Sequence, residues 1–439
     1  MRSLALFCEL AMLLPVTLAQ PFVGVILWSW ISFMNPHQLV YGGIALAIPW
    51  ALIIFICTIL GCFIAREPKR FPFNAVTCLI MAFLVMISLT TVVALGPTDQ
   101  VMAKYLTVFK AFLFLLVTAA LTTGRERIHA LVWIMALSLA YFGIKGGAFT
   151  LLTGGSSRVW GPPNTMISDN NQLAVGLLVA VPLMNYLRSE SKHALIRWGF
   201  AATMVLTVFG VVGTYSRGAL LALAAMSFVL WWKTSNKLLS GVVLLVLVGG
   251  AIAFMPADWV ERMHTIQNYQ EDASAQDRLQ IWYTAWVMAT SRPLTGAGFF
   301  ATYTQPVVDM FTPGTGWRAV HSIWFEVLAE HGFPTFFVWV GIIIAGVVYA
   351  RRVVRQATGV PGLEWCVHLA KMSQASTLAY VVGGSFLSLS YWDYYFTIVV
   401  MTSAVYEHVK ATLGQPEAAR NATKFGPSRL ALSQSTRQA

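Results

Sequence analysis

Residues 73–95 read FNAVTCLIMAFLVMISLTTVVAL and contain no charged side chain. A helix of this kind can cross a bilayer, which takes about 20 largely apolar residues. The whole chain of 439 residues has the same character, with 57% hydrophobic residues, 11% charged residues and a mean hydropathy of +0.67. Soluble domains carry about 25% charged residues. The composition therefore excludes soluble, disordered and fibrous proteins and predicts an all-α, polytopic integral membrane protein.

Similar apolar runs recur along the chain and predict about twelve transmembrane helices. Residues 1–34 are also apolar, but Pro15 and the pair Gln20-Pro21 interrupt them, so we expect one span and a broken or half-inserted helix there. The other runs lie at about 42–65, 103–123, 130–149, 172–187, 198–215, 218–232, 238–255, 323–350, 366–390 and 395–412.

The basic residues predict the orientation of the chain in the membrane. If the spans alternate, most lysines and arginines between them fall in connections on one side, such as 66–70, 125–127, 188–197, 233–237 and 351–355. By the positive-inside rule that side is cytoplasmic, and both termini lie there. The net charge of +11 is then explained by the orientation of the chain in its membrane, and no nucleic acid partner is expected.

The opposite side carries two long connections, at about 150–171 and 256–322, and long connections are usually functional. Two helices are expected in the second, at about 257–270 and 275–291. Leu279, Trp282 and Trp286 recur there with the spacing of an amphipathic helix on a membrane surface. The expected organisation is an N-terminal transmembrane bundle (1–255), a helical periplasmic loop (256–322), C-terminal transmembrane helices (323–412) and a cytoplasmic tail (413–439).

Three groups of ionisable residues are expected on that outer side. Arg217 lies in a turn between two apolar runs, Arg278 lies in the second long connection, and His321 precedes a span that contains Glu326 and Glu330. Each has a structural explanation when taken alone: a snorkelling arginine, a solvated helix face, a structural histidine and an interhelical hydrogen bond. Together they place two arginines and one base on the same face of the membrane.

This combination of residues suits one kind of chemistry. The planar guanidinium group of arginine matches phosphate oxygens in pairs, and histidine accepts a proton near neutral pH. Two fixed cations and a base suit a reaction with a phosphorylated leaving group and a hydroxyl nucleophile. The sequence has no GxxxxGK[ST] loop for a nucleotide and no metal-binding HExxH motif. A donor on this face would most simply be a lipid-linked pyrophosphate, delivered from within the bilayer.

The order of these motifs resembles the O-antigen ligase and polymerase superfamily. Its members share an SRG turn (216–218), an RLxxW motif (278–282), a GAGFF-like segment that begins at Gly296, and an HSxxxEVLAEHG motif (321–332). The segments 20–25, 34–37, 160–163 and 169–171 are similar to the O-glycosylation-ligase branch found beside exosortase systems. Many relatives have His-Asn where this chain has His321-Ser322. Because the histidine is retained, we expect the residue at position 322 to tune orientation only.

The resemblance implies a GT-C-type fold in the bacterial inner membrane and a specific reaction. The enzyme would be an inverting glycosyltransferase without metal or cofactor, moving O-antigen en bloc from undecaprenyl pyrophosphate to a sugar hydroxyl of the lipid A core on the periplasmic face. Arg217 and Arg278 would hold the donor pyrophosphate, and His321 would be the general base. The expected supporting or sugar-contacting residues are Glu326, Glu330, Arg158, Asp169 and Trp282.

Two other functions remain open at this point. One keeps the donor and changes the acceptor, as in an O-antigen polymerase or a protein O-oligosaccharyltransferase. The other is a transporter of lipid-linked glycan, which would typically show paired repeats and ionisable residues at the bilayer midplane. The sequence shows no such repeat, and its outer-face residues lie near one surface.

Overall fold

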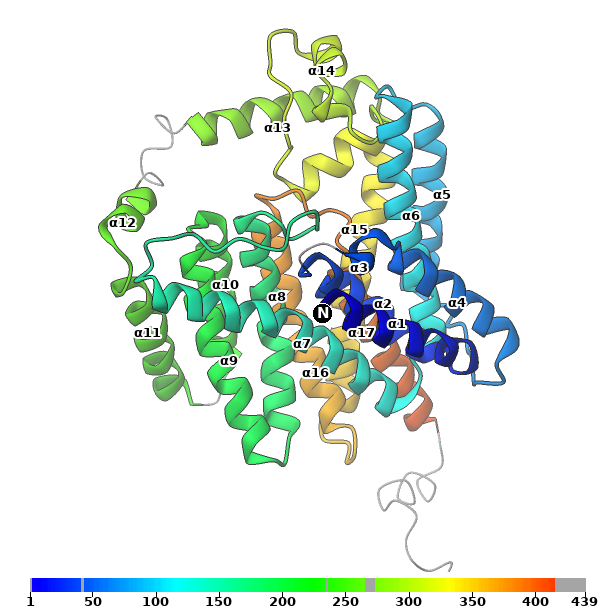
Figure 1. The fold of residues 1–439 in the computed structure, drawn as a ribbon, viewed down its shortest axis with the longest axis vertical. Helices are drawn as coiled ribbons and strands as arrows, with labels where there is room; N and C mark the ends of the chain where they lie inside the picture. The colour runs from blue at the N-terminus through cyan, green and yellow to red at the C-terminus, as the bar shows by residue number, and fades with distance from the viewer. Residues whose placement is uncertain (1, 41–42, 234–235, 265–272, 415–439) are drawn as a thin grey trace, which may run out of the picture.

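The computed structural model describes residues 2–40, 43–233, 236–264 and 273–414. Within those ranges every regular element is a helix, which confirms the predicted all-α class (Figure 1). The helices that follow the eleven predicted apolar runs beyond residue 40 are α4 (Trp50–Ile64), α5 (Ala75–Val92), α6 (Thr98–Leu121), α7 (Gly124–Leu152), α8 (Asn170–Glu190), α9 (Ala194–Gly213), α10 (Arg217–Lys233), α11 (Lys237–Ala253), α15 (Ile323–Ala357), α16 (Glu364–Gly384) and α17 (Asp393–Leu413).

The N-terminal region is divided at Gln20-Pro21, whereas Pro15 lies within a continuous helix. Helix α1 (Arg2–Ala19) ends directly before Gln20, and α2 (Pro21–Phe33) has proline at its first position. The short helices η1 (Pro36–Gln38) and α3 (Ile44–Ala47) follow. Proline suits the first turn of a helix because the N–H that it lacks would have no partner within the helix there.

Six of the described helices are long and apolar enough to cross a membrane: α1, α5, α6, α7, α9 and α15. A seventh candidate arises if α11 and the following α12 (Ala257–His264), which bend by 111°, count as one broken span. The chain is therefore a multi-pass membrane protein. Helices α8, α16 and α17 have 21 residues each but are more polar. The number of about twelve spans and the GT-C type of fold stay predictions.

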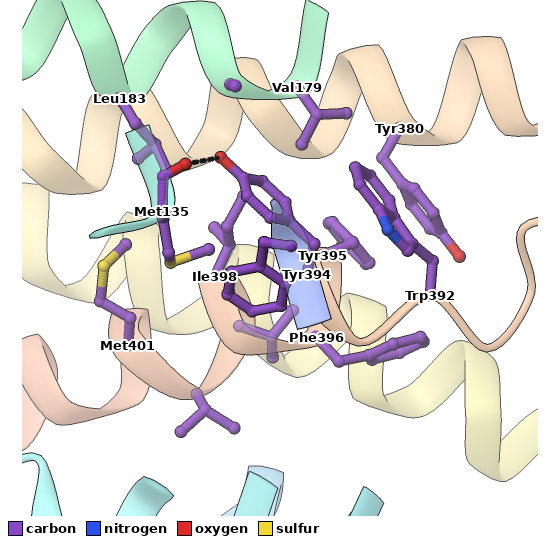
Figure 2. Close-up of a cluster of buried hydrophobic side chains, with 14 of the residues drawn as sticks. Met135, Val179, Leu183, Tyr380, Trp392, Tyr394, Tyr395, Phe396, Ile398 and Met401 are labelled. Carbon is purple, nitrogen blue, oxygen red and sulfur yellow. Dashed lines mark hydrogen bonds between the residues drawn. The ribbon is translucent and has the colours of Figure 1, made fainter. Parts of the chain in front are cut away.

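Helix α17 explains why a polar helix can lie within such a bundle. Almost every residue from Asp393 to Ser403 is buried, so few of its side chains face lipid. Its aromatic residues form the centre of the core shown in Figure 2, where the Tyr394 hydroxyl donates to the Met135 carbonyl at 3.2 Å. The Tyr395 ring stacks on that of Tyr380 with centroids 3.8 Å apart. Internal hydrogen bonds satisfy polar groups that lipid could not.

The loops gather at two ends of the bundle. At one end, which we call the basic end, Arg127 pairs with Glu67, and Glu190 lies 4.0 Å from Arg125 and 3.4 Å from His368. At the other end, which we call the site end, Leu95 N–H donates to the Ala297 carbonyl at 2.9 Å, and Val159 N–H donates to the Gly213 carbonyl at 3.0 Å. Lysine- and arginine-rich connections thus share one end, as the alternation of spans predicted.

The second long connection contains α12, α13 (Ala273–Ser291), η2 (Ala301–Tyr303) and α14 (Gln305–Phe311). Residues 265–272, which include the end of the helix expected at 257–270, lie outside the described residues, as does most of the predicted tail at 415–439. Figure 1 shows α13 lying roughly horizontal near the top of the view, with one end beside the upper ends of the upright α5 and α6. The helix expected at 275–291 is confirmed by α13.

Helix α13 has two apolar faces. The buried face consists of Ile281, Ala285 and Met288, which lie opposite the stripe named from the sequence. Leu279 and Trp286 of that stripe remain 48% and 47% exposed. An exposed apolar face on a helix lying across the bundle is typical of a helix at a membrane surface.

Helix α15 is broken near its start, and the GAGFF segment fills the break. Gly332 has a φ of 72°, and Pro334 has no N–H to donate to the Glu330 carbonyl four residues earlier. Gly298 N–H donates to that carbonyl instead, at 2.9 Å, and Ala297 N–H donates to the preceding carbonyl, that of Ala329, at 2.8 Å. The GAGFF segment therefore supplies the backbone N–H groups that bond the carbonyls left without helical partners at the break in α15.

Candidate functional site

Arg217 is the first residue of α10 and directly follows a tight turn at the site end. Tyr215 in this turn has a positive φ of 61°, and its hydroxyl donates to the Gly155 carbonyl at 2.6 Å. The Ser216 hydroxyl accepts a hydrogen bond of 3.2 Å from the Ala219 N–H and caps the helix. These bonds fix the backbone position from which the Arg217 side chain extends.

His321 lies directly before the N-cap of α15, with its backbone in the left-handed region at a φ of 50°. Its N–H donates to the Ser388 hydroxyl at 3.0 Å, and the Gln172 amide donates to the Ser388 carbonyl at 3.3 Å. The Tyr303 side chain shares a hydrogen bond with the Ser388 side chain. Ser388 thus holds the backbone of His321, and Gln172 and Tyr303 hold Ser388 in turn. The Nδ1 of His321 is buried without a hydrogen-bond partner among the described residues.

The surroundings of His321 keep its ring neutral. Burial lowers its pKa from the usual 6.5, and the positive charge of Arg278 lowers it further. Asp169 and Glu326 act in the opposite direction. These influences place Arg278, Asp169 and Glu326 within electrostatic reach of the imidazole. A neutral imidazole can accept a proton, as a general base must.

Packing links the start of α10 to the same region. A methyl group in place of the Gly218 hydrogen would lie 3.5 Å from Phe386 Cβ. The Phe386 ring lies 6.4 Å from that of Trp282, centroid to centroid. The Trp282 indole donates to the Val320 carbonyl, one residue before His321, at 2.8 Å. The structure thus brings the SRG turn, the RLxxW helix and the histidine together through Phe386 and Trp282, although they are far apart in the sequence.

Glu326 and Glu330 belong to a buried ion cluster with Lys104 of α6. Lys104 Nζ lies 3.1 Å from Glu326 Oε1 and 2.7 Å from Glu330 Oε1. The Ser390 hydroxyl donates to Glu326 Oε2 at 2.6 Å, and the Tyr391 hydroxyl donates to Glu330 Oε2 at 2.7 Å. Both carboxylates therefore have partners for each oxygen, as buried charges require.

Aromatic rings and backbone donors complete this ion cluster. Lys104 Nζ lies 5.2 Å from the centroid of the Tyr391 ring and 5.6 Å from those of Phe299 and Phe300, within the range of cation–π attraction. Phe300 N–H donates to Glu330 Oε1 at 3.2 Å. The GAGFF segment thus contacts both the helix break and the ion cluster, and Glu326 connects the ion cluster to His321 electrostatically.

Sequence reasoning missed Lys104, Tyr303 and Ser388. A signal for Lys104 existed, because a lysine within an apolar run is costly and normally has a functional or structural partner. Tyr303 and Ser388 gave no such signal, since one serine or tyrosine in a loop resembles many others. Their role as supports for the His321 backbone follows only from the folded arrangement.

The two residues expected in the first outer connection have different surroundings. Asp169 caps α8 by accepting from the Asn171 N–H at 2.8 Å, and its charge acts on His321. The Arg158 guanidinium lies over the Tyr215 ring, 5.5 Å from its centroid. Asp169 thus faces the histidine region, and Arg158 contacts the turn before Arg217.

In the ranges that the structure describes, no group of three or more His, Cys, Asp and Glu side chains could hold a metal ion. The polar groups that meet at the site end are instead arginines, a histidine and hydroxyls. Such a set suits a ligand that carries negative charge and exchanges a proton.

Comparison with known families divides the chain into two matched segments. Residues 202–340 match the family described as O-antigen ligase, and residues 1–192 match a family of unknown function, DUF5935. No curated protein matches the chain. Residues 202–340 contain Arg217, Arg278 and His321, and their match supports the resemblance to the O-antigen ligase superfamily. That family implies a glycosyl-transferring enzyme of the O-antigen ligase or polymerase type.

Proposed function

We propose that the chain is an O-antigen ligase that transfers a glycan from undecaprenyl pyrophosphate to a hydroxyl of the lipid A core. The observation that carries this proposal is the neutral, backbone-strained His321 within the field of Arg278, inside the segment that matches the O-antigen ligase family. A non-glycine residue held at positive φ costs free energy and is often found at functional sites.

In this reaction the acceptor hydroxyl attacks the anomeric carbon of the donor sugar. The new carbon–oxygen bond forms as the bond from that carbon to the pyrophosphate oxygen breaks, and His321 takes the proton of the hydroxyl. The leaving group is undecaprenyl pyrophosphate, on which negative charge grows. Arg217 and Arg278 stabilise this charge with fixed guanidinium groups, and attack opposite the leaving group inverts the anomeric centre.

The distribution of charge supports a periplasmic site. The basic end carries the arginine- and lysine-rich connections, which the positive-inside rule assigns to the cytoplasm of the inner membrane. On this assignment the site end faces the periplasm and both termini lie in the cytoplasm. Both substrates are lipids, so they approach the site from the membrane.

Product identity distinguishes this function from its alternatives. A ligase converts lipid A core into a product carrying one transferred glycan, whereas a polymerase leaves a glycan ladder on lipid pyrophosphate and a protein oligosaccharyltransferase modifies serine or threonine. A transporter moves intact donor across proteoliposomes without forming a glycosidic bond. Purified chain supplied with donor and lipid A core is expected to give the first product, and any of the others contradicts the ligase assignment.

Arg278→Lys is expected to reduce kcat nearly as much as Arg278→Ala, by about 10²–10³-fold, because lysine keeps the charge but loses the paired geometry. The matched control is Arg292→Lys. The Arg292 guanidinium donates to the Val93 carbonyl at 2.8 Å and to the Thr295 hydroxyl at 3.4 Å, and a lysine ammonium can also donate to such separate acceptors. Initial rates of glycan transfer test both variants. An Arg278→Lys enzyme as fast as the control would show that charge alone suffices at this position.

Asp169→Asn is expected to shift the acid limb of the pH–rate profile to lower pH. The base works only while neutral, and a pKa below the usual 6.5 puts the loss of activity below that pH. Asp169 raises the pKa of His321, so its neutralisation lowers this pKa further. Asparagine keeps an oxygen for the cap of α8.

The measurement is kcat/KM from about pH 5 to about pH 8, the range in which a histidine titrates. The control is Asp309→Asn, which neutralises an exposed carboxylate on α14. If the acid limb of Asp169→Asn moves to higher pH, or if the limb of Asp309→Asn moves by the same amount, the assignment of His321 as the titrating base is contradicted.

A further inference from the structure

A cavity of about 620 Å³ lies beside the first outer connection and apart from the His321 region. Its walls come from η1 and the two residues after it, α3, α7, α8 and residues 158–164. The polar side chains in the walls include Gln38, Lys145, Arg158 and Asn164, and none of the lining residues is Asp or Glu. This volume lies in the range of small-molecule binding sites. The cavity is therefore large enough for a headgroup and has a positive lining.

Lys145 lies near the end of α7 that leads into the first outer connection. It is 21 residues after Gly124, the first residue of α7 at the basic end, or about 32 Å along the helix axis at 1.5 Å per residue. Figure 1 shows α7 running obliquely past the upright α8 and α9, so this end of the helix and the connection after it together border the cavity.

The mouth of the cavity is accessible from the lipid. Trp160 is 58% exposed, and the apolar Leu46 and Phe149 in the cavity wall are 43% and 41% exposed. Tryptophan is enriched at the interface between membrane and water, and exposed leucine and phenylalanine suit contact with acyl chains. A ligand that enters here is expected to be anchored in the bilayer.

The cavity shares a wall with the predicted donor site. Arg158 contacts the Tyr215 ring, and Tyr215 lies two residues before Arg217. The neighbouring Val159 N–H donates to the Gly213 carbonyl at 3.0 Å, which attaches this connection to the end of α9. A lipid bound in the cavity would therefore lie beside the turn that positions one of the pyrophosphate-binding arginines.

We propose that this cavity binds a phosphate group on the lipid-anchored acceptor, with Lys145 and Arg158 as its two cationic contacts. The identification of the acceptor as a phosphorylated glycolipid rests on the proposed ligase function. The binding of a lipid phosphate by these side chains does not, because it can be measured without donor. Arginine and lysine both bind phosphate, through paired hydrogen bonds and as a point charge, respectively.

The test measures binding of lipid A core to the full-length chain in nanodiscs without donor, using the natural bis-phosphorylated lipid and the same lipid after phosphatase treatment. Lys145→Gln and Arg158→Gln are each expected to weaken binding of the phosphorylated lipid about tenfold, the size of one charge-assisted hydrogen bond. Binding of the dephosphorylated lipid should be weaker in the wild type and unchanged by either variant. Lys192→Gln, at an exposed lysine in the basic end, is the control.

Three outcomes would overturn the proposal. The first is that both variants bind phosphorylated lipid A core as tightly as the wild type. The second is that the variants lose as much affinity for the dephosphorylated lipid as for the phosphorylated one. The third is that the variants lose affinity only for phosphatidylglycerol vesicles, which would assign the cavity to bulk phospholipid. Among the residues that the structure describes, Lys145 makes no hydrogen bond, ion pair or ring contact with the Tyr215 turn, so its variant tests the cavity even if Arg158→Gln perturbs the fold. Normal phosphate-dependent binding with no transfer would sink the ligase function and leave the lipid-phosphate site intact.

Discussion

His321→Ala is expected to slow glycan transfer by about 10²–10⁴-fold while leaving the donor bound, because general-base assistance contributes this much to rate. Arg217 and Arg278, which are expected to hold the pyrophosphate, are unchanged in this variant. The loss should therefore appear in kcat, with little change in donor KM. The measurement is the steady-state rate with each substrate varied in turn.

The backbone of His321 requires a second variant. Its φ of 50° lies in the left-handed region, where alanine is less favourable than histidine or asparagine. His321→Asn keeps a residue that tolerates this conformation but cannot act as a base near neutral pH. It should be as slow as His321→Ala, and His193→Ala, at an exposed histidine of the basic end, should be normal. Full transfer by the asparagine variant would remove His321 from the reaction.

Lys104→Met is expected to destabilise the folded chain by about 3–5 kcal/mol, because it leaves two buried carboxylates without their cation. The side chains of Glu326 and Glu330 are only 5% and 1% exposed, so water cannot replace the ammonium group. The midpoint of thermal unfolding in detergent tests this expectation. Lys110→Met removes another lysine from α6 and should cause a much smaller change.

The ion cluster also predicts a rescue. Lys104→Met combined with Glu326→Gln and Glu330→Gln replaces the buried charges with neutral groups of similar size, so much of the lost stability should return. A triple variant no more stable than the single one would show that Lys104 acts mainly through its aromatic contacts or its own packing. A single variant as stable as the wild type would contradict the existence of the buried ion cluster.

The helices could be predicted from the sequence because apolar length is a local property. The run at 73–95 becomes α5 at Ala75–Val92, and Asn74 begins it with a capping box. The division at Gln20-Pro21 was also readable, since proline is a local signal. The number of membrane spans could not be read from the sequence, because α17 is polar in composition yet buried in the bundle. Hydropathy does not distinguish a polar helix that other helices cover from a helix that lies outside the membrane.

Long-range contacts account for most of what the sequence did not reveal. The break in α15 depends on N–H groups of the GAGFF segment, about 30 residues earlier. The cation that pairs with Glu326 and Glu330, Lys104, lies on α6, more than 200 residues earlier. The exposed Leu279 and Trp286 of α13 agree with the expected membrane-surface face, but the second, buried apolar face was not predicted, because periodicity does not say which of two apolar faces packs inside.

The candidate site was predictable in its residue types and not in its geometry. Arginine and histidine on the outer side suggested phosphate binding and proton transfer, which are properties of the side chains themselves. Their proximity depends on Phe386 and Trp282, and the conformation of His321 depends on Ser388. None of these three contacts has a signature in local sequence, since each joins segments that only the fold brings together.

The most direct test of the central claim is product analysis with purified chain, chelator, undecaprenyl-pyrophosphate glycan labelled in its sugar, and lipid A core. If Arg217, Arg278 and His321 form one transfer site, the label moves to lipid A core and one undecaprenyl pyrophosphate is released for each glycan joined. The Arg278→Ala and His321→Asn enzymes should then form little product. Label that stays on the lipid carrier in the wild type, or transfer that survives both substitutions, would contradict the account.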